Sequence, residues 1–210
     1  MLKSLFFLLI ICCSKPLHAQ NIRVETFIGT EAPVLDVFWL KRVAKNSQFL
    51  FLSRNTYSIP EYKEGTDQFS TLNILAYQIK KTGFGFAVAA TARTNSSFQA
   101  RSGIQFLKVK PNEWLLYTII SSKLGEQADV RWLTIFQFTP KINENWQLFT
   151  RAEWVSSVGF TDAHRFSSGM VRIGLQRSKW QFGLGSDFLW LGKDFKGTDT
   201  NYGIFLTHLF

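Results

Sequence analysis

Cysteine is scarce in this sequence: its 210 residues contain two, Cys12 and Cys13, and both lie close to the N-terminus. A disulfide framework or a cysteine-based metal site is therefore excluded from the rest of the chain. The sequence also has few histidines, three in all, and no acidic partners for a metal site can be placed beside them. It contains no glycine-rich phosphate loop followed by a helix and no nucleic-acid-binding motif. These absences predict no metal, no cofactor and no nucleic-acid partner.

The N-terminal residues have the pattern of a signal peptide. A positive charge at Lys3 precedes the apolar run 5–11, and the small residue Ala19 marks a predicted cleavage point. The run is too short for a transmembrane helix, and no apolar run of helix length follows it. We therefore expect residues 1–19 to be removed as a signal peptide, which leaves one exported domain over residues 20–210.

Charge is the second compositional signal. The full sequence has a formal net charge of +9, and loss of Lys3 and Lys15 with the leader reduces it to +7. The basic residues are dispersed rather than clustered, which argues against a nucleic-acid surface. We expect them to contact anionic lipid headgroups or the phosphates of lipopolysaccharide.

Apolar residues recur at every second position in short runs that turn residues separate, and this period is typical of β-strands. In the segment 179–191, Trp180, Phe182 and Leu184 share one face, opposite Gln181 and Gly183. Runs of this length exclude a helical membrane protein. We predict about twelve strands, with ten as the alternative, at residues 21–28, 34–42, 47–59, 69–80, 83–93, 98–108, 113–121, 130–139, 145–156, 166–177, 179–191 and 201–210.

The spacing of the tryptophans favours a membrane barrel over a soluble β-sandwich. Trp146 and Trp154 share one strand face, and Trp180 and Trp190 share another. At about 3.3 Å per residue and a strand tilt of about 40°, each pair spans about 20–25 Å along the membrane normal. That span matches an apolar band with an aromatic girdle at each edge. We therefore predict an all-β, up-and-down antiparallel transmembrane β-barrel, with a soluble sandwich or ligand-binding barrel as the alternative; the predicted girdle is Trp39, Trp114, Trp132, Trp146, Trp154, Trp180 and Trp190.

The last ten residues form an apolar strand face with Tyr202, Ile204 and Leu206, followed by the aromatic Phe210. This pattern resembles the C-terminal assembly signal of bacterial outer-membrane β-barrels. Together with the junction after Ala19, it makes the chain similar to small outer-membrane barrels of Bacteroidota-type bacteria. The resemblance implies an outer-membrane location and the barrel-assembly machinery as a partner. It implies no particular activity.

The predicted connections alternate in length along the chain. Those at residues 60–68, 122–129, 157–165 and 192–200 are longer than most of the connections between them. Outer-membrane barrels have short periplasmic turns and longer outer loops. We therefore expect the long connections to lie on the outer side.

Charged residues are expected to face the lumen, because a charge facing lipid costs about 2–4 kcal/mol at the membrane midplane. A lumen rich in arginine indicates a narrow passive channel for small polar or anionic solutes. The alternative is that the arginines and carboxylates pair across the interior and seal it as a structural network. The predicted lumen-lining residues are Arg54, Arg93, Arg101, Arg131, Arg151, Glu153, Arg172 and Asp187.

One connection places Asp162, His164 and Ser167 close together. Histidine beside serine and a carboxylate is the chemistry of acyl hydrolysis, which makes a lipid-modifying enzyme of the outer membrane an alternative function. Triad members usually come from distant parts of a sequence. We therefore expect a non-enzymatic barrel.

Overall fold

Twelve β-strands account for most of the described chain, which covers residues 22–44, 46–63, 65–94, 96–125, 129–160, 164–192 and 197–210 of the computed structural model. The signal-peptide residues predicted at 1–19 lie outside this description. No helix within it is both long enough and apolar enough to cross a membrane. The strands are β1 (Arg23–Gly29), β2 (Pro33–Arg42), β3 (Phe49–Ser58), β4 (Gln68–Gln78), β5 (Phe84–Arg93), β6 (Ser96–Lys110), β7 (Trp114–Lys123), β8 (Asp129–Phe138), β9 (Gln147–Gly159), β10 (His164–Arg177), β11 (Trp180–Leu191) and β12 (Gly197–Leu209).

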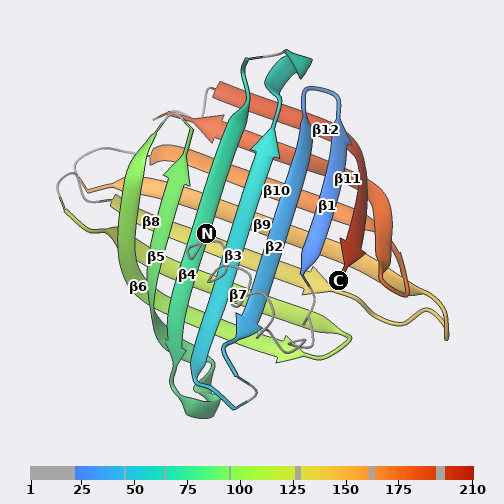
Figure 1. Ribbon diagram of the computed structural model, residues 1–210, viewed down its shortest axis with the longest axis horizontal. Coiled ribbons are helices and arrows are strands. Elements are labelled where there is room, and N and C mark those ends of the chain that lie inside the picture. The colour runs from blue at the N-terminus through green and yellow to red at the C-terminus, as the bar shows by residue number, and fades with distance from the viewer. Residues whose placement is uncertain are drawn as a thin grey trace, which may run out of the picture.

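The strands form one closed antiparallel barrel in which each strand pairs with its neighbours in sequence. Closure is made by β1 and β12, with Val24 opposite His208 and Phe27 opposite Phe205. In Figure 1, β1 to β5 form the near wall and cross the strands of the far wall at a large angle, as tilted barrel strands do. The predicted up-and-down barrel of twelve strands is confirmed, and the β-sandwich alternative is wrong.

The two rims of the barrel follow from this topology. The terminal rim is where β1 begins and β12 ends, and it carries the turns 111–113 and 178–179. The opposite rim, here the far rim, is where β5 ends and β8 begins.

The four connections expected to be long all lie at the far rim, but three of them are shorter than predicted. Strands β9 and β10 extend through Gly159 and from His164, so most of the loop expected at 157–165 is strand. The connection expected at 192–200 is likewise shortened because β12 begins at Gly197. Polar residues such as Ser156 and Ser157 continue the ladder, since each still pairs with a partner on a neighbouring strand.

The interior of the barrel has two kinds of wall, one lined by apolar side chains and one by charged side chains. Apolar side chains from β2 to β8 form a buried cluster that includes Leu52, Ile74, Tyr117 and Ile135. Charged side chains face inward from β1, β2, β3, β9, β10 and β11 and, nearer the far rim, from β5, β6 and β8; three of the largest fully buried side chains are arginines. The outward face is apolar too, with Leu184 at 69% exposure. The alternation of the sequence therefore separates exposed apolar residues from an interior that is both apolar and charged.

Candidate functional site

A buried ion-pair network crosses the middle of the barrel. On one wall, Arg23 Nη2 lies 2.9 Å from Asp36 Oδ2, and Arg54 Nε lies 2.9 Å from Asp36 Oδ1. Arg54 also pairs with Glu153, which belongs to β9 on the opposite wall, and Glu153 pairs in turn with Arg151. Because Arg54 bonds to carboxylates of two walls, it connects β2 and β3 with β9 through the lumen.

Arg172 on β10 forms the second arm of this network. Its Nε lies 2.9 Å from Glu25 Oε1, and its Nη1 lies 2.8 Å from Asp187 Oδ1. The Thr207 hydroxyl donates to the other oxygen of Glu25 at 3.1 Å. The guanidinium carbon of Arg172 is 3.9 Å from the ring centre of Phe27, so the aromatic ring packs against this cation.

The charges of the network balance. Its members are Arg23, Arg54, Arg151, Arg172, Glu25, Asp36, Glu153 and Asp187. The Phe38 ring lies between two of its cations, with Arg151 at 4.3 Å and Arg23 at 5.4 Å from the ring centre. Buried charges persist only when they are paired and hydrogen-bonded, so this balance explains how so many ionic groups are tolerated in the interior.

The network separates cavities at the two rims. On the side of the far rim, a cavity of about 260 Å³ is lined by residues that include Arg54, Arg93, Arg101 and Arg131. A smaller cavity of about 180 Å³ adjoins it and shares Arg54. On the side of the terminal rim, a cavity of about 350 Å³ is lined by residues that include Arg23, Phe38 and Arg151. Among the described residues, this last cavity shares no lining residue with the other two.

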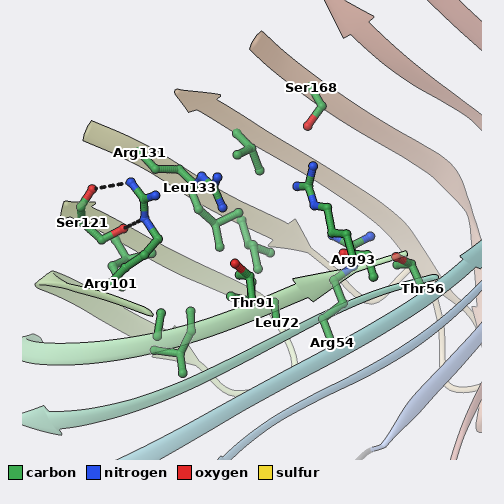
Figure 2. A pocket seen from close by; sticks show the side chains of 16 residues that line it. Arg54, Thr56, Leu72, Thr91, Arg93, Arg101, Ser121, Arg131, Leu133 and Ser168 are labelled. Carbon is green, nitrogen blue, oxygen red and sulfur yellow. Dashed lines mark hydrogen bonds between the residues drawn. The ribbon is translucent and has the colours of Figure 1, made fainter. Parts of the chain in front are cut away.

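The far-rim cavity is lined by cationic and hydroxyl groups. Figure 2 shows the side chains of Arg93, Arg101 and Arg131 entering it from β5, β6 and β8. Arg101 Nη2 lies 2.6 Å from Asp129 Oδ1, and its Nε donates to the Ser121 hydroxyl at 3.2 Å. Hydroxyls of Thr56, Ser70, Thr91, Ser121 and Ser168 complete the polar part of the lining.

All eight predicted lumen residues face the interior. Arg54, Arg151, Glu153, Arg172 and Asp187 belong to the network, and Arg93, Arg101 and Arg131 line the far-rim cavity, where Arg54 also contributes. The prediction omitted Arg23, Phe38 and Asp129, which also line the interior. Arg23 and Glu25 alternate with Phe27 on one face of β1, which is the signal that could have found them.

The predicted girdle tryptophans all lie on the outward face, in two rows. Trp39, Trp114, Trp146 and Trp180 lie nearer the terminal rim, and Trp132, Trp154 and Trp190 nearer the far rim. The rings of Trp154 and Trp190 are 5.2 Å apart, and Trp146 meets Phe182 edge-on at 6.1 Å.

The apolar face of β12 is also outward, since Tyr202, Ile204 and Leu206 are all exposed. Phe210 follows the strand, and its N–H donates to the carbonyl of Ile22 at 3.0 Å.

The structure brings together two of the three residues considered for acyl hydrolysis. His164 Nε2 lies 2.8 Å from Ser167 Oγ, and His164 Nδ1 lies 2.9 Å from the carbonyl oxygen of Gly192. Ser167 is only 1% exposed and also contacts the Ser156 hydroxyl, whereas a nucleophile must be accessible to substrate. Asp162 lies outside the described residues. Within the described ranges, no three His, Cys, Asp or Glu residues are grouped to hold a metal ion.

Comparisons with known proteins find similarity of fold only. No protein-family model matches this chain, and no curated protein matches it. Among solved structures, a chain from a study of the in-meso crystallization of membrane proteins is 7% identical, with a TM-score of 0.45 over 90% of this chain and 84% of that one. The β domain of the Bordetella autotransporter BrkA is 8% identical, with a TM-score of 0.38 over 91% and 98%. A chain from work on the asymmetric conductivity of engineered proteins is 6% identical, with a TM-score of 0.30 over 90% and 99%. At these values no residue role carries over to this chain.

Proposed function

We propose that this protein is an outer-membrane β-barrel whose apolar outward face lies in lipid. Large apolar side chains, including Leu184, Phe86 and Ile104, are exposed all around the barrel, which would be costly in water. The two rows of tryptophans lie where girdles at the edges of an apolar band are expected. The basic character of the chain supports contacts with lipopolysaccharide phosphates.

Export and assembly belong to the same proposal. Residues 1–19 would direct the chain out of the cytoplasm, and the outward face of β12 with Phe210 would be read by the barrel-assembly machinery. The membership among Bacteroidota-type barrels and the cleavage after Ala19 stay predictions.

We further propose that the lumen of the barrel is sealed and does not conduct. This conclusion depends on the Arg54–Glu153 pair. Both residues are in the middle of their strands, and their bond joins opposite walls. The walls facing the network carry the apolar cluster around Tyr117, and Tyr117 itself is fully buried. A passive channel would need a continuous wet path, but the cavities at the two rims share no lining residue. The geometry therefore favours the sealed network over the channel.

Conductance in planar lipid bilayers tests this function. The purified, folded protein should insert without producing current steps, and the shift between its heated and unheated forms on SDS gels would verify that the barrel is folded. Stable, reproducible current steps from the folded protein would contradict the closed barrel and restore the channel hypothesis.

A further inference from the structure

Two arginines of the far-rim cavity have no carboxylate partner. Arg93 on β5 and Arg131 on β8 both line this cavity, and within the described chain neither has an acidic oxygen within 4.0 Å. Both instead lie against the Phe166 ring, with guanidinium carbons 5.7 and 5.5 Å from its centre. Arg131 has one further polar contact, a donation to the side-chain oxygen of Gln99 at 3.4 Å. Their hydrogen-bonding capacity is therefore largely unused.

A third arginine of the same cavity is only partly satisfied. Arg101 is 2% exposed and is held by Asp129 and Ser121, yet its Nη1 has no hydrogen-bond partner among the residues that the structure describes. Arg131 Nε is buried and likewise without a partner. A buried donor that makes no hydrogen bond costs about 1–3 kcal/mol, so both arginines would gain from a further hydrogen-bond partner.

The charge of the cavity favours an anion. Among the described residues, its lining contains four arginines and neither aspartate nor glutamate. Arg54 is neutralised by the network and Arg101 by Asp129, which leaves the two positive charges of Arg93 and Arg131. Arg93 is exposed, Arg131 is half-buried and Arg101 is buried, so the three guanidinium groups extend from the far rim into the cavity.

We propose that the far-rim cavity binds a phosphate group that enters from the far rim. A guanidinium group donates two parallel N–H bonds to a phosphate, and two unpaired arginines match its double negative charge. The serine and threonine hydroxyls of the lining supply further donors. The volume of about 260 Å³ restricts the ligand to inorganic phosphate, a small phosphate ester or the single phosphorylated headgroup of a lipid. This site would exist whether or not the barrel conducts, so the proposal of a phosphate site does not depend on the proposal that the lumen is sealed.

Isothermal titration of the full-length folded protein with sodium phosphate, at low ionic strength in a zwitterionic detergent, tests the site. Sodium acetate and sodium chloride serve as comparison anions, and we expect measurable heat from phosphate alone. The variants Arg93→Gln and Arg131→Gln should each weaken phosphate binding about tenfold, because each removes one charge-assisted pair. Arg93→Lys keeps the charge and should retain part of the affinity.

Arg177→Gln is the matched control. Arg177 also lies over an aromatic ring, that of Trp146 at 5.3 Å, but it is at the terminal rim and outside the cavity. It should leave phosphate affinity unchanged. An equal loss in Arg177→Gln would show binding to diffuse charge and overturn the proposal, as would unchanged affinity in both cavity variants.

Vesicles with and without lipopolysaccharide distinguish the two sources of phosphate. If the protein binds vesicles only when they contain lipopolysaccharide, and Arg93→Gln loses this binding, the ligand of the site is a lipid headgroup. If the protein binds free phosphate, the ligand is a soluble one. Absence of both would refute the site.

Discussion

At the scale of single residues, the most consequential group is the Glu153 carboxylate, which is shared by Arg54 and Arg151 in the middle of the barrel. Removing one partner of a buried ionic network leaves the others unpaired and costs about 3–5 kcal/mol. We therefore expect Glu153→Gln to lower the free energy of unfolding by about that amount, measured by urea titration in lipid vesicles.

Glu61→Gln is the control for that measurement. Glu61 also pairs with a cation, Lys63, but both side chains are about two-thirds exposed. Exposed ion pairs contribute little to stability, so we expect no measurable change. Equal effects in the two variants would mean that the network in the barrel is solvated and does not seal it.

The same residues show what sequence can and cannot predict. The inward orientation of Arg54 and Glu153 follows from the two-residue period of their strands, and the structure places both in the lumen. Their pairing could not be predicted, because they are 99 residues apart and the contact depends on the curvature of the whole barrel. The fully buried Phe149 and the apolar cluster were missed for a related reason, since a membrane barrel was expected to have a polar interior.

At the scale of the strands, the outward face of β11 provides a direct test of membrane placement. Leu184 is near the middle of this strand, between Ile173 and Ile204 on the neighbouring strands, and is 69% exposed. In lipid, Leu184→Arg should cost about 2–4 kcal/mol, because the new charge lies close to the midplane. On a water-exposed surface the same substitution would change stability by about 0.5 kcal/mol at most. Unfolding free energies in phospholipid vesicles distinguish the two.

Phe160→Arg is matched to this variant, since Phe160 is 70% exposed but follows the end of β9 at the far rim. It should be nearly neutral in the same vesicles. A cost for Leu184→Arg no larger than that for Phe160→Arg would favour the soluble ligand-binding barrel.

Strand existence could be predicted for every element, because alternation leaves a period of two in each. Strand ends could not be predicted as well. β9 continues through Ser157 and β10 begins at His164, both of which were expected to lie in a loop, because cross-strand pairing satisfies their backbone whatever the polarity of the side chains. Ser156, Ser167 and His164 form a chain of contacts at this end of the two strands, which is an ordinary means of satisfying hydroxyls near a rim.

At the scale of the whole molecule, a stack of side chains adds to the Arg54–Glu153 pair in separating the cavities of the two rims. The guanidinium of Arg151 lies over the Phe38 ring, Arg23 lies near the same ring, and all three line the cavity of the terminal rim. Arg151 also contacts Glu153, which lines a cavity on the other side. Truncating Phe38 and Arg151 together should therefore join the cavities into a water-filled path. We expect Phe38→Ala/Arg151→Ala to produce current steps in planar bilayers where the wild-type protein produces none.

Leu40→Ala is the control for this opening, because Leu40 lines the same terminal-rim cavity without belonging to the stack. It should remain silent in the bilayer, and the heated and unheated forms on SDS gels should verify that every variant is folded. The opened variant should prefer anions, because loss of Arg151 still leaves Arg93, Arg101 and Arg131 along the path on the far-rim side. A folded double variant that stays silent would place the seal in the apolar cluster around Tyr117 instead, and Tyr117→Ala in the same background would then be expected to conduct.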